Sequence, residues 1–353
     1  MKPAISNQGV LQDQLISARQ LCSNDALIRS LVNDLHRVVP KIYWFDFLLS
    51  TAIGWSALLA AMALPLFSWM MFVAAAIASM AFYRALCFVH ELSHQASRAL
   101  PGFGLAYNLL AGYPMLMPSF VYVGVHQNHH KVSLYGTEKD PEYLPFARSY
   151  WMTVLFAIEG FLIPLLLLLR FVCLSPIGFV LPNFQHWLVI HASALTINTK
   201  YRREANQQLV GRIRRESLLI FLGWSAYLGL ALAGIVSFRF LIVWLFVSSL
   251  LSLMNTARTL GSHAYESDGK PMDRMAQLQD SIDTPGAFWT ELWAPVGLRY
   301  HALHHYFPGI PYHSLPLAYR RIVINRSLKI DYERMSSPSL PASLSKLLRS
   351  GLR

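Results

Sequence analysis

Apolar residues fill two long stretches of the chain, and each has the length of a pair of membrane-spanning helices. No charged residue occurs in residues 47–83, a run of 37 positions. One span needs about 20 apolar residues, so this run predicts two helices with a tight turn near Pro65. The second stretch, residues 217–238 and 240–257, is interrupted only by Arg239. We therefore expect an all-α integral membrane protein with four transmembrane helices in two hairpins, together with interfacial helices and a cytosolic histidine-rich cap.

Two further regions are apolar without a clear spanning pattern. Residues 151–198 contain the charged Glu159 and Arg170. The segments on both sides are expected on one side of the membrane, so this region crosses twice or not at all, and we favour membrane-embedded or interfacial helices. Residues 104–125 are interrupted by prolines, and we expect them to dip into the membrane without spanning it.

Polar segments precede and follow this membrane domain in the sequence. Residues 23–39 predict an amphipathic surface helix that begins at Ser23 and carries Leu27, Leu31 and Leu35 on one face. The sequence thus divides into an N-terminal segment (1–43), a membrane-embedded domain (44–325) and a C-terminal tail (326–353).

The distribution of charged residues indicates how the protein is oriented in the membrane. Charged residues make up 14% of the chain, against about 25% in soluble domains, and the formal net charge is +11. The basic residues gather beside the spans rather than on a nucleic-acid-binding surface: Lys200, Arg202, Arg203, Arg212, Arg214 and Arg215. Loops rich in Lys and Arg stay cytoplasmic, so we expect both termini and the large polar segments in the cytosol. The positive surface suits anionic lipid headgroups or an acidic electron carrier.

Nine of the thirteen histidines form a pattern. Positions i, i+3 and i+4 share one face of a helix, so the spacings HxxxH and HxxHH each direct imidazoles to one point. The nine residues belong to HELSH (His90, His94), HQNHH (His126, His129, His130), HALHH (His301, His304, His305) and the segment RTLGSH (His263). All lie on the same side of the predicted membrane. We therefore expect them to converge on a catalytic metal centre.

Several kinds of metal site could account for this pattern. HELSH alone matches a zinc protease, in which Glu91 would act as base, but the other clustered histidines would then have no role. A carboxylate di-iron bundle needs a second Glu-x-x-His copy, which the clusters lack. A histidine-rich metal carrier would have a low-complexity tract. Nine imidazoles suffice for two metals, and two iron ions fit best, with Glu91 outside the ligand set.

From about residue 47 to 321 the sequence resembles the membrane-bound fatty acid desaturases and their related hydroxylases. HELSH, HQNHH and HALHH correspond to the three histidine boxes of that family, and His263 in NTARTLGSH stands where the family has an extra metal-binding residue. The stretch 280–316 is similar to bacterial members, which implies the bacterial inner membrane. The resemblance implies that two iron ions bind His90, His94, His126, His129, His130, His263, His301, His304 and His305.

The reaction implied by this resemblance is an O2-dependent oxidation of an unactivated methylene group. The expected product carries a double bond in a fatty acyl chain, and the substrate is an acyl-lipid, an acyl-CoA or an acyl carrier. Hydroxylation or ketolation of a lipid or carotenoid by the same fold remains an alternative, and an intramembrane zinc protease is a more distant one. His301 stands where front-end desaturases have glutamine. No HPGG haem motif occurs, so electrons must come from a separate protein of ferredoxin or cytochrome b5 type.

Polar residues near the boxes are candidates for orienting the ligand imidazoles. Asp140, Glu142, Asp280 and Asp283 could accept hydrogen bonds from imidazoles or could be exposed loop carboxylates. For Asn255 a packing role is favoured over a metal contact.

Overall fold

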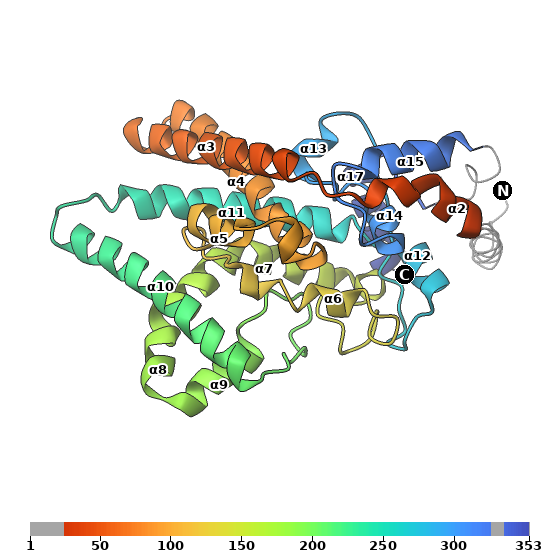
Figure 1. Ribbon diagram of the computed structural model, residues 1–353. Coiled ribbons are helices and arrows are strands. Elements are labelled where there is room, and N and C mark those ends of the chain that lie inside the picture. Colours follow the sequence, from red (N-terminus) through yellow and green to blue (C-terminus); the bar gives the residue numbers. More distant parts are fainter. Residues whose placement is uncertain (1–24, 326–334, 353) are drawn as a thin grey trace.

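The computed structural model describes residues 25–325 and 335–352, and this part of the chain is helical without strands (Figure 1). The helices, in chain order, are α2 (Asp25–Val32), α3 (Pro40–Ala63), α4 (Trp69–His94), α5 (Phe103–Tyr107), α6 (His126–His129), α7 (Tyr150–Leu168), α8 (Ser175–Val180), α9 (Pro182–His191), α10 (Gln207–Leu232), α11 (Arg239–Leu260), α12 (Arg274–Asp280), α13 (Thr290–Trp293), α14 (His301–Tyr306), α15 (Leu315–Ile324) and α17 (Leu340–Gly351). Two π-helical turns, Asn108–Gly112 and Leu169–Leu174, follow α5 and α7.

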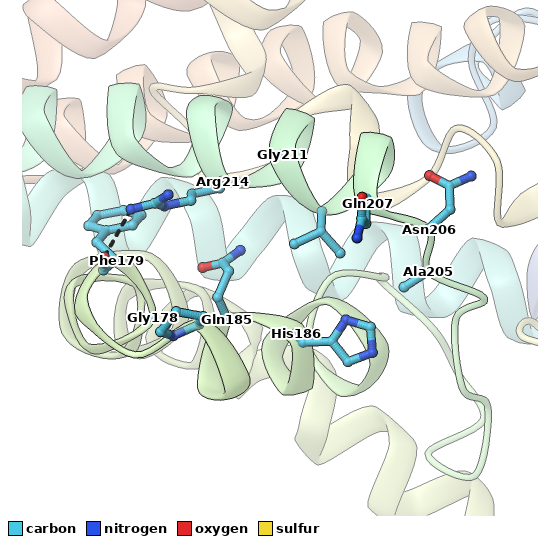
Figure 2. A pocket seen from close by; sticks show the side chains of 11 residues that line it. Gly178, Phe179, Gln185, His186, Ala205, Asn206, Gln207, Gly211 and Arg214 are labelled. Carbon is cyan, nitrogen blue, oxygen red and sulfur yellow. Dashed lines mark hydrogen bonds between the residues drawn. The ribbon is translucent and has the colours of Figure 1, made fainter.

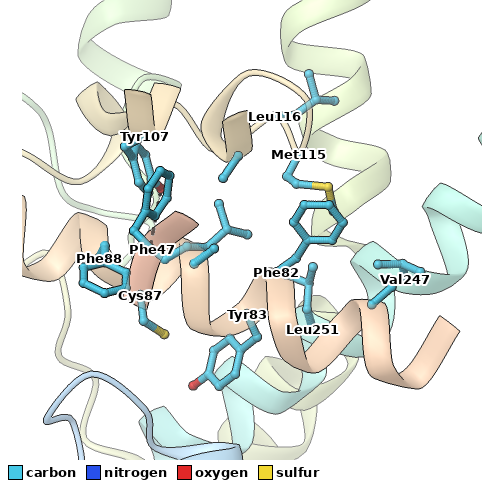
Figure 3. Packing of buried hydrophobic residues seen from close by; sticks show 14 of the residues in the cluster. Phe47, Phe82, Tyr83, Cys87, Phe88, Tyr107, Met115, Leu116, Val247 and Leu251 are labelled. Atoms are coloured by element: carbon cyan, nitrogen blue, oxygen red, sulfur yellow. Dashed lines mark hydrogen bonds between the residues drawn. The ribbon is translucent and has the colours of Figure 1, made fainter. Parts of the chain in front are cut away.

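The first predicted hairpin is confirmed as α3 and α4. Pro40 opens α3, where its missing N–H is not needed, and the Ser68 hydroxyl caps α4 by accepting the Met71 N–H. Pro65 lies in the short turn between the two helices. Figure 3 shows the buried face of α4, where Phe82, Tyr83 and Phe88 lie among apolar residues of neighbouring elements.

Four helices are long and apolar enough to cross a membrane, as predicted, but they are not the four expected. They are α3, α4, α11 and the nearly continuous helix Tyr150–Val180 that comprises α7, its π-helical turn and α8. The helix α10 is not among them because its first turns carry Arg212, Arg214 and Arg215. The apolar part of this helix, residues 217–232, is too short for a full span.

The second hairpin is open rather than closed. The helices α10 and α11 touch near their connecting turn, where the Trp224 and Trp244 rings lie 4.7 Å apart, and then diverge (Figure 1). The helix α11 packs chiefly on α7 and α4 instead. In residues 151–198, where interfacial helices were expected, the structure has one long helix, α7–α8, which is a candidate span, followed by the shorter α9. At ten residues, α9 is about 15 Å long, half of a membrane core.

The segment around α5 occupies the space between α4, α10 and α11. The Trp244 indole donates a hydrogen bond to the Pro114 carbonyl at 3.0 Å, and the Tyr107 hydroxyl donates to the Met117 carbonyl at 3.1 Å. The apolar helix here, Phe103–Gly112, is short, in keeping with a segment that does not span. This segment fills the space inside the helix bundle.

The polar ends of the chain fold over one end of the helices. The short α2 buries Ile28 and Val32, and Leu35 follows in a 3-10 turn. The predicted face was wrong at Leu27, which is 38% exposed, because Ile28 and Val32 form the buried face of the helix instead. Ser23 lies outside the described residues. The C-terminal residues from Leu340 form α17, which packs on α7 and α11.

Candidate metal centre

Each histidine motif ends or begins a helix at the same end of the bundle. HELSH is the last turn of α4, HQNHH forms the single turn α6, and HALHH opens α14. His263 follows α11 after a two-residue connection. The Asp283 carboxylate caps α14 by accepting the N–H groups of Ala302 at 2.7 Å and Leu303 at 3.2 Å. The cap holds the third box in place.

The structure brings all nine predicted histidines together in two groups. Within each group the ring nitrogens that could bind one ion lie within 4.8 Å of one another. The first group contains His90, His94, His126, His130 and His304, and the second contains His129, His263, His301 and His305. HQNHH and HALHH contribute to both groups, so neighbouring imidazoles of one helical turn serve adjacent sites. His186, His191 and His313 belong to neither group.

The Nε2 atoms point at one another inside each group. In the second group His263 Nε2 lies 2.8 Å from His301 Nε2 and 3.2 Å from His129 Nε2. In the first group His304 Nε2 lies 3.1 Å from His94 Nε2 and 3.3 Å from His130 Nε2. Two imidazoles that bind one ion at about 2.1 Å and at right angles place their nitrogens about 3 Å apart. The spacing therefore fits a shared metal ion in each group.

Burial favours the neutral form of most of these rings, which is the form that binds a metal ion. Outside the membrane-spanning helices, burial and the neighbouring imidazoles hold the pKa values of five of the histidines well below the usual range: His126, His130, His301, His304 and His305. Burial also opposes the charged form of His129, but the Asp140 carboxylate outweighs it, so the pKa of His129 lies above its usual value. His129 is thus the imidazole whose environment most favours a positive charge.

Carboxylates orient two imidazoles of HQNHH directly. Both oxygens of Asp140 contact His129 Nδ1, at 2.9 and 3.0 Å, and Glu142 Oε1 lies 2.7 Å from His126 Nδ1. Asp140 is fully buried, and burial raises the pKa of Glu142 to about 7. An ionised carboxylate only accepts hydrogen bonds, so each contact favours the tautomer with the proton on Nδ1 and the Nε2 lone pair directed at the metal position.

A tyrosine links His263 to Asp280. The Tyr135 hydroxyl lies 2.8 Å from His263 Nδ1 and donates to Asp280 Oδ2 at 2.7 Å, while Tyr143 donates to Asp280 Oδ1 at 2.9 Å. Asp280 itself is 3.5 Å from His263 Nδ1. Of the four carboxylates singled out in the sequence, Asp140 and Glu142 contact imidazoles directly and Asp280 acts through Tyr135. Asp283 is the helix cap described above.

Glu91 is turned away from the metal positions. Its carboxylate accepts hydrogen bonds from the Tyr43 hydroxyl and from the Tyr312 N–H, and Oε1 is 3.8 Å from His90 Nδ1. This geometry does not suit the free base of a zinc protease. Asn255 accepts a hydrogen bond from Arg258 at 3.0 Å and lies in neither histidine group.

No pattern in the sequence pointed to Tyr43, Tyr122 or Tyr135, although all three bond to residues of the site. The Tyr122 hydroxyl lies 2.8 Å from His126 Nδ1 and 3.1 Å from Glu142 Oε2. Tyrosines are common in apolar helices and loops, and only the folded arrangement shows which of the sixteen in the chain meet the histidines.

Comparison with known proteins places this geometry in a family. Residues 67–327 match the family described as fatty acid desaturase. The chain is also 38% identical over 328 residues to a ceramide hydroxylase of Caulobacter vibrioides (strain NA1000 / CB15N), an alignment that covers 91% of this chain and 92% of the relative. All three predicted boxes and His263 fall inside the matched region. The chain therefore belongs to the fatty acid desaturase family, a family of membrane-bound lipid-modifying enzymes.

Proposed function

We propose that this protein is an O2-dependent lipid hydroxylase that oxidises an aliphatic carbon of a ceramide-like lipid. The observation that carries the proposal is the pair of histidine groups in a chain 38% identical to a ceramide hydroxylase along almost its whole length. Desaturation, the reaction expected from the sequence, is the second candidate, because desaturases and hydroxylases share the histidine boxes.

The metal positions take two iron ions in this proposal. His90, His94, His126, His130 and His304 hold one, and His129, His263, His301 and His305 hold the other. Iron bound there supplies the activation of O2 and the oxidation of the C–H bond. Asp140, Glu142 and Tyr135 hold the imidazoles of His129, His126 and His263 in their orientation. The burial of His126, His129 and His304 keeps bulk water from the metal positions.

The overall reaction needs an external reductant. Hydroxylation converts one C–H bond, O2, two electrons and two protons into C–OH and water. Desaturation uses the same electrons and protons but removes two hydrogens from adjacent carbons and gives two waters. A separate ferredoxin or cytochrome b5 type protein supplies the electrons. We place the site and both termini on the cytosolic side of a bacterial inner membrane.

Lipid mass spectrometry of a host that makes the chain tests the proposal. A ceramide or related lipid heavier by one oxygen, absent when His304→Ala replaces the wild type, is expected for the hydroxylase. A lipid lighter by two hydrogens would assign the chain to the desaturases instead. No change in any lipid, with an electron donor and iron supplied, would contradict both reactions.

A further inference from the structure

A pocket lies between α8, α9 and the first turns of α10 (Figure 2). Its volume is about 490 Å³, within the range of small-molecule sites, and it shares no residue with the histidine groups. The space exists partly because α10 has no side chain at Gly211, where an added Cβ would meet no atom within 4 Å. The pocket is therefore open to a ligand on the α10 side.

One wall of the pocket holds a buried polar group without a partner. The Gln185 side chain is 3% exposed, and its Nε2 makes no hydrogen bond within the described ranges 25–325 and 335–352. Its Oε1 would lie 2.6 Å from a Cβ at Gly178, so the amide packs closely on α8. Figure 2 shows this amide directed from α9 into the space under α10. A buried N–H without an acceptor is unfavourable, so a ligand that supplies an acceptor is expected.

The opposite wall adds positive charge. The Arg214 guanidinium donates one hydrogen bond to the Phe179 carbonyl at 2.9 Å, drawn as a dashed line in Figure 2, and carries further N–H donors. The pocket also reaches the N-terminus of α10, where the Asn206 side chain accepts only the Leu209 N–H. The first N–H groups of a helix attract anions, and none of the residues that line the pocket is acidic.

The surroundings of the pocket are apolar. On α8 and α9 the side chains of Ile177, Val180 and Trp187 are 45%, 77% and 45% exposed. Arg214, which bonds to the Phe179 carbonyl of α8, is exposed as well. This pairing of exposed apolar residues with a cation is typical of the boundary between acyl chains and headgroups. An amphiphile with apolar chains and one anionic group matches both the exposed apolar residues and the cation.

We propose that this pocket binds the phosphodiester headgroup of an anionic phospholipid. A phosphate oxygen accepts from Gln185 Nε2, the Arg214 guanidinium neutralises the charge, and the acyl chains lie along the exposed apolar residues of α8 and α9. The site is independent of the oxidation proposed above, since no histidine of the metal centre takes part.

Native mass spectrometry of the full chain, purified in detergent and stripped of lipid, tests the site. We expect dioleoyl phosphatidylglycerol to bind, and dioleoylglycerol, which has the same chains without phosphate, to bind at least about tenfold more weakly. Gly211→Phe should fill the pocket and abolish the adduct, and Arg214→Gln should weaken it about tenfold. Gly223→Phe on the same helix, where an added Cβ also meets nothing within 4 Å, is the matched control and should bind as the wild type does.

Three results would overturn the proposal. They are undiminished phosphatidylglycerol binding by Gly211→Phe, equal binding of dioleoylglycerol, and binding of inorganic phosphate without binding of the lipid. If Gly211→Phe does not fold, Gln185→Met, which keeps the side-chain length but removes the donor, takes its place and should weaken phosphatidylglycerol binding.

Discussion

The Asp140 carboxylate contacts His129 Nδ1 with both of its oxygens, at 2.9 and 3.0 Å. The two residues are eleven positions apart in one loop, and Asp140 also accepts the backbone N–H groups of Gly136 and Glu142, each at 2.9 Å. The carboxylate therefore fixes the loop and the imidazole together. With the proton held on Nδ1, His129 Nε2 faces His263 and the second metal position.

Asp140→Asn should weaken iron binding by about 10- to 100-fold, the usual cost of losing a partner that orients a metal ligand. The amide keeps most of the shape but loses the charge that favours the Nδ1–H tautomer. Iron content after equilibrium dialysis measures the effect. Asp268→Asn is the control, because Asp268 pairs with Lys270 on the surface. Unchanged iron content in Asp140→Asn would contradict the orienting role.

Tyr135→Phe should affect one metal position more than the other. Its hydroxyl joins His263 to Asp280, and His263 belongs to the four-histidine group alone. We expect the variant to hold about one iron ion per chain where the wild type holds two. Tyr143→Phe, which also loses a hydrogen bond to Asp280 but none to His263, should keep both. Equal loss of both ions from Tyr135→Phe would mean that the two groups do not bind independently.

His304→Ala should abolish lipid oxidation. His304 Nε2 lies near the Nε2 atoms of both His94 and His130. Its removal therefore takes from the five-histidine group a ligand that contacts two others. The measurement is product formation with iron, O2 and reductant supplied. His191→Ala serves as the comparison, since His191 is exposed and bonds only to the Trp187 carbonyl in the described structure. Full activity in His304→Ala would rule out the nine-ligand arrangement.

The sequence predicted the histidine site better than its surroundings. HxxxH and HxxHH spacings direct side chains by local helix geometry, so the motifs could be recognised without knowing the fold. Tyr135 meets Asp280 across 145 positions, and Glu91 meets Tyr312 across 221. Such contacts depend on how distant elements pack, which no local pattern encodes.

The membrane helices show the same difference between local pattern and tertiary packing. Residues 47–83 are free of charge and form the predicted α3–α4 hairpin. The second pair was assigned from apolar length alone, but the arginines at the start of α10 shorten its apolar part, and the segment around α5 lies between α10 and α11. The sequence identified the apolar segments, while their pairing depended on a tertiary contact between α7 and α11.

That contact depends on a glycine. A Cβ at Gly160 of α7 would lie 2.2 Å from Thr256 Oγ1 and 3.2 Å from Thr256 Cγ2 of α11, so the two helices approach each other at this point as small residues allow in membranes. Gly160→Ala should lower the free energy of unfolding by about 1–3 kcal/mol, the range for overpacking, measured by thermal or denaturant unfolding in detergent.

A second substitution separates this close approach from other effects. Thr256→Ala removes both of those threonine atoms, so the double variant Gly160→Ala/Thr256→Ala should be more stable than the sum of the two single changes predicts. Gly229→Ala in α10, where an added Cβ meets nothing within 4 Å, should not destabilise the protein. If Gly160→Ala were as stable as Gly229→Ala, or if the two changes at the contact were additive, the packing of α7 on α11 would not depend on this glycine.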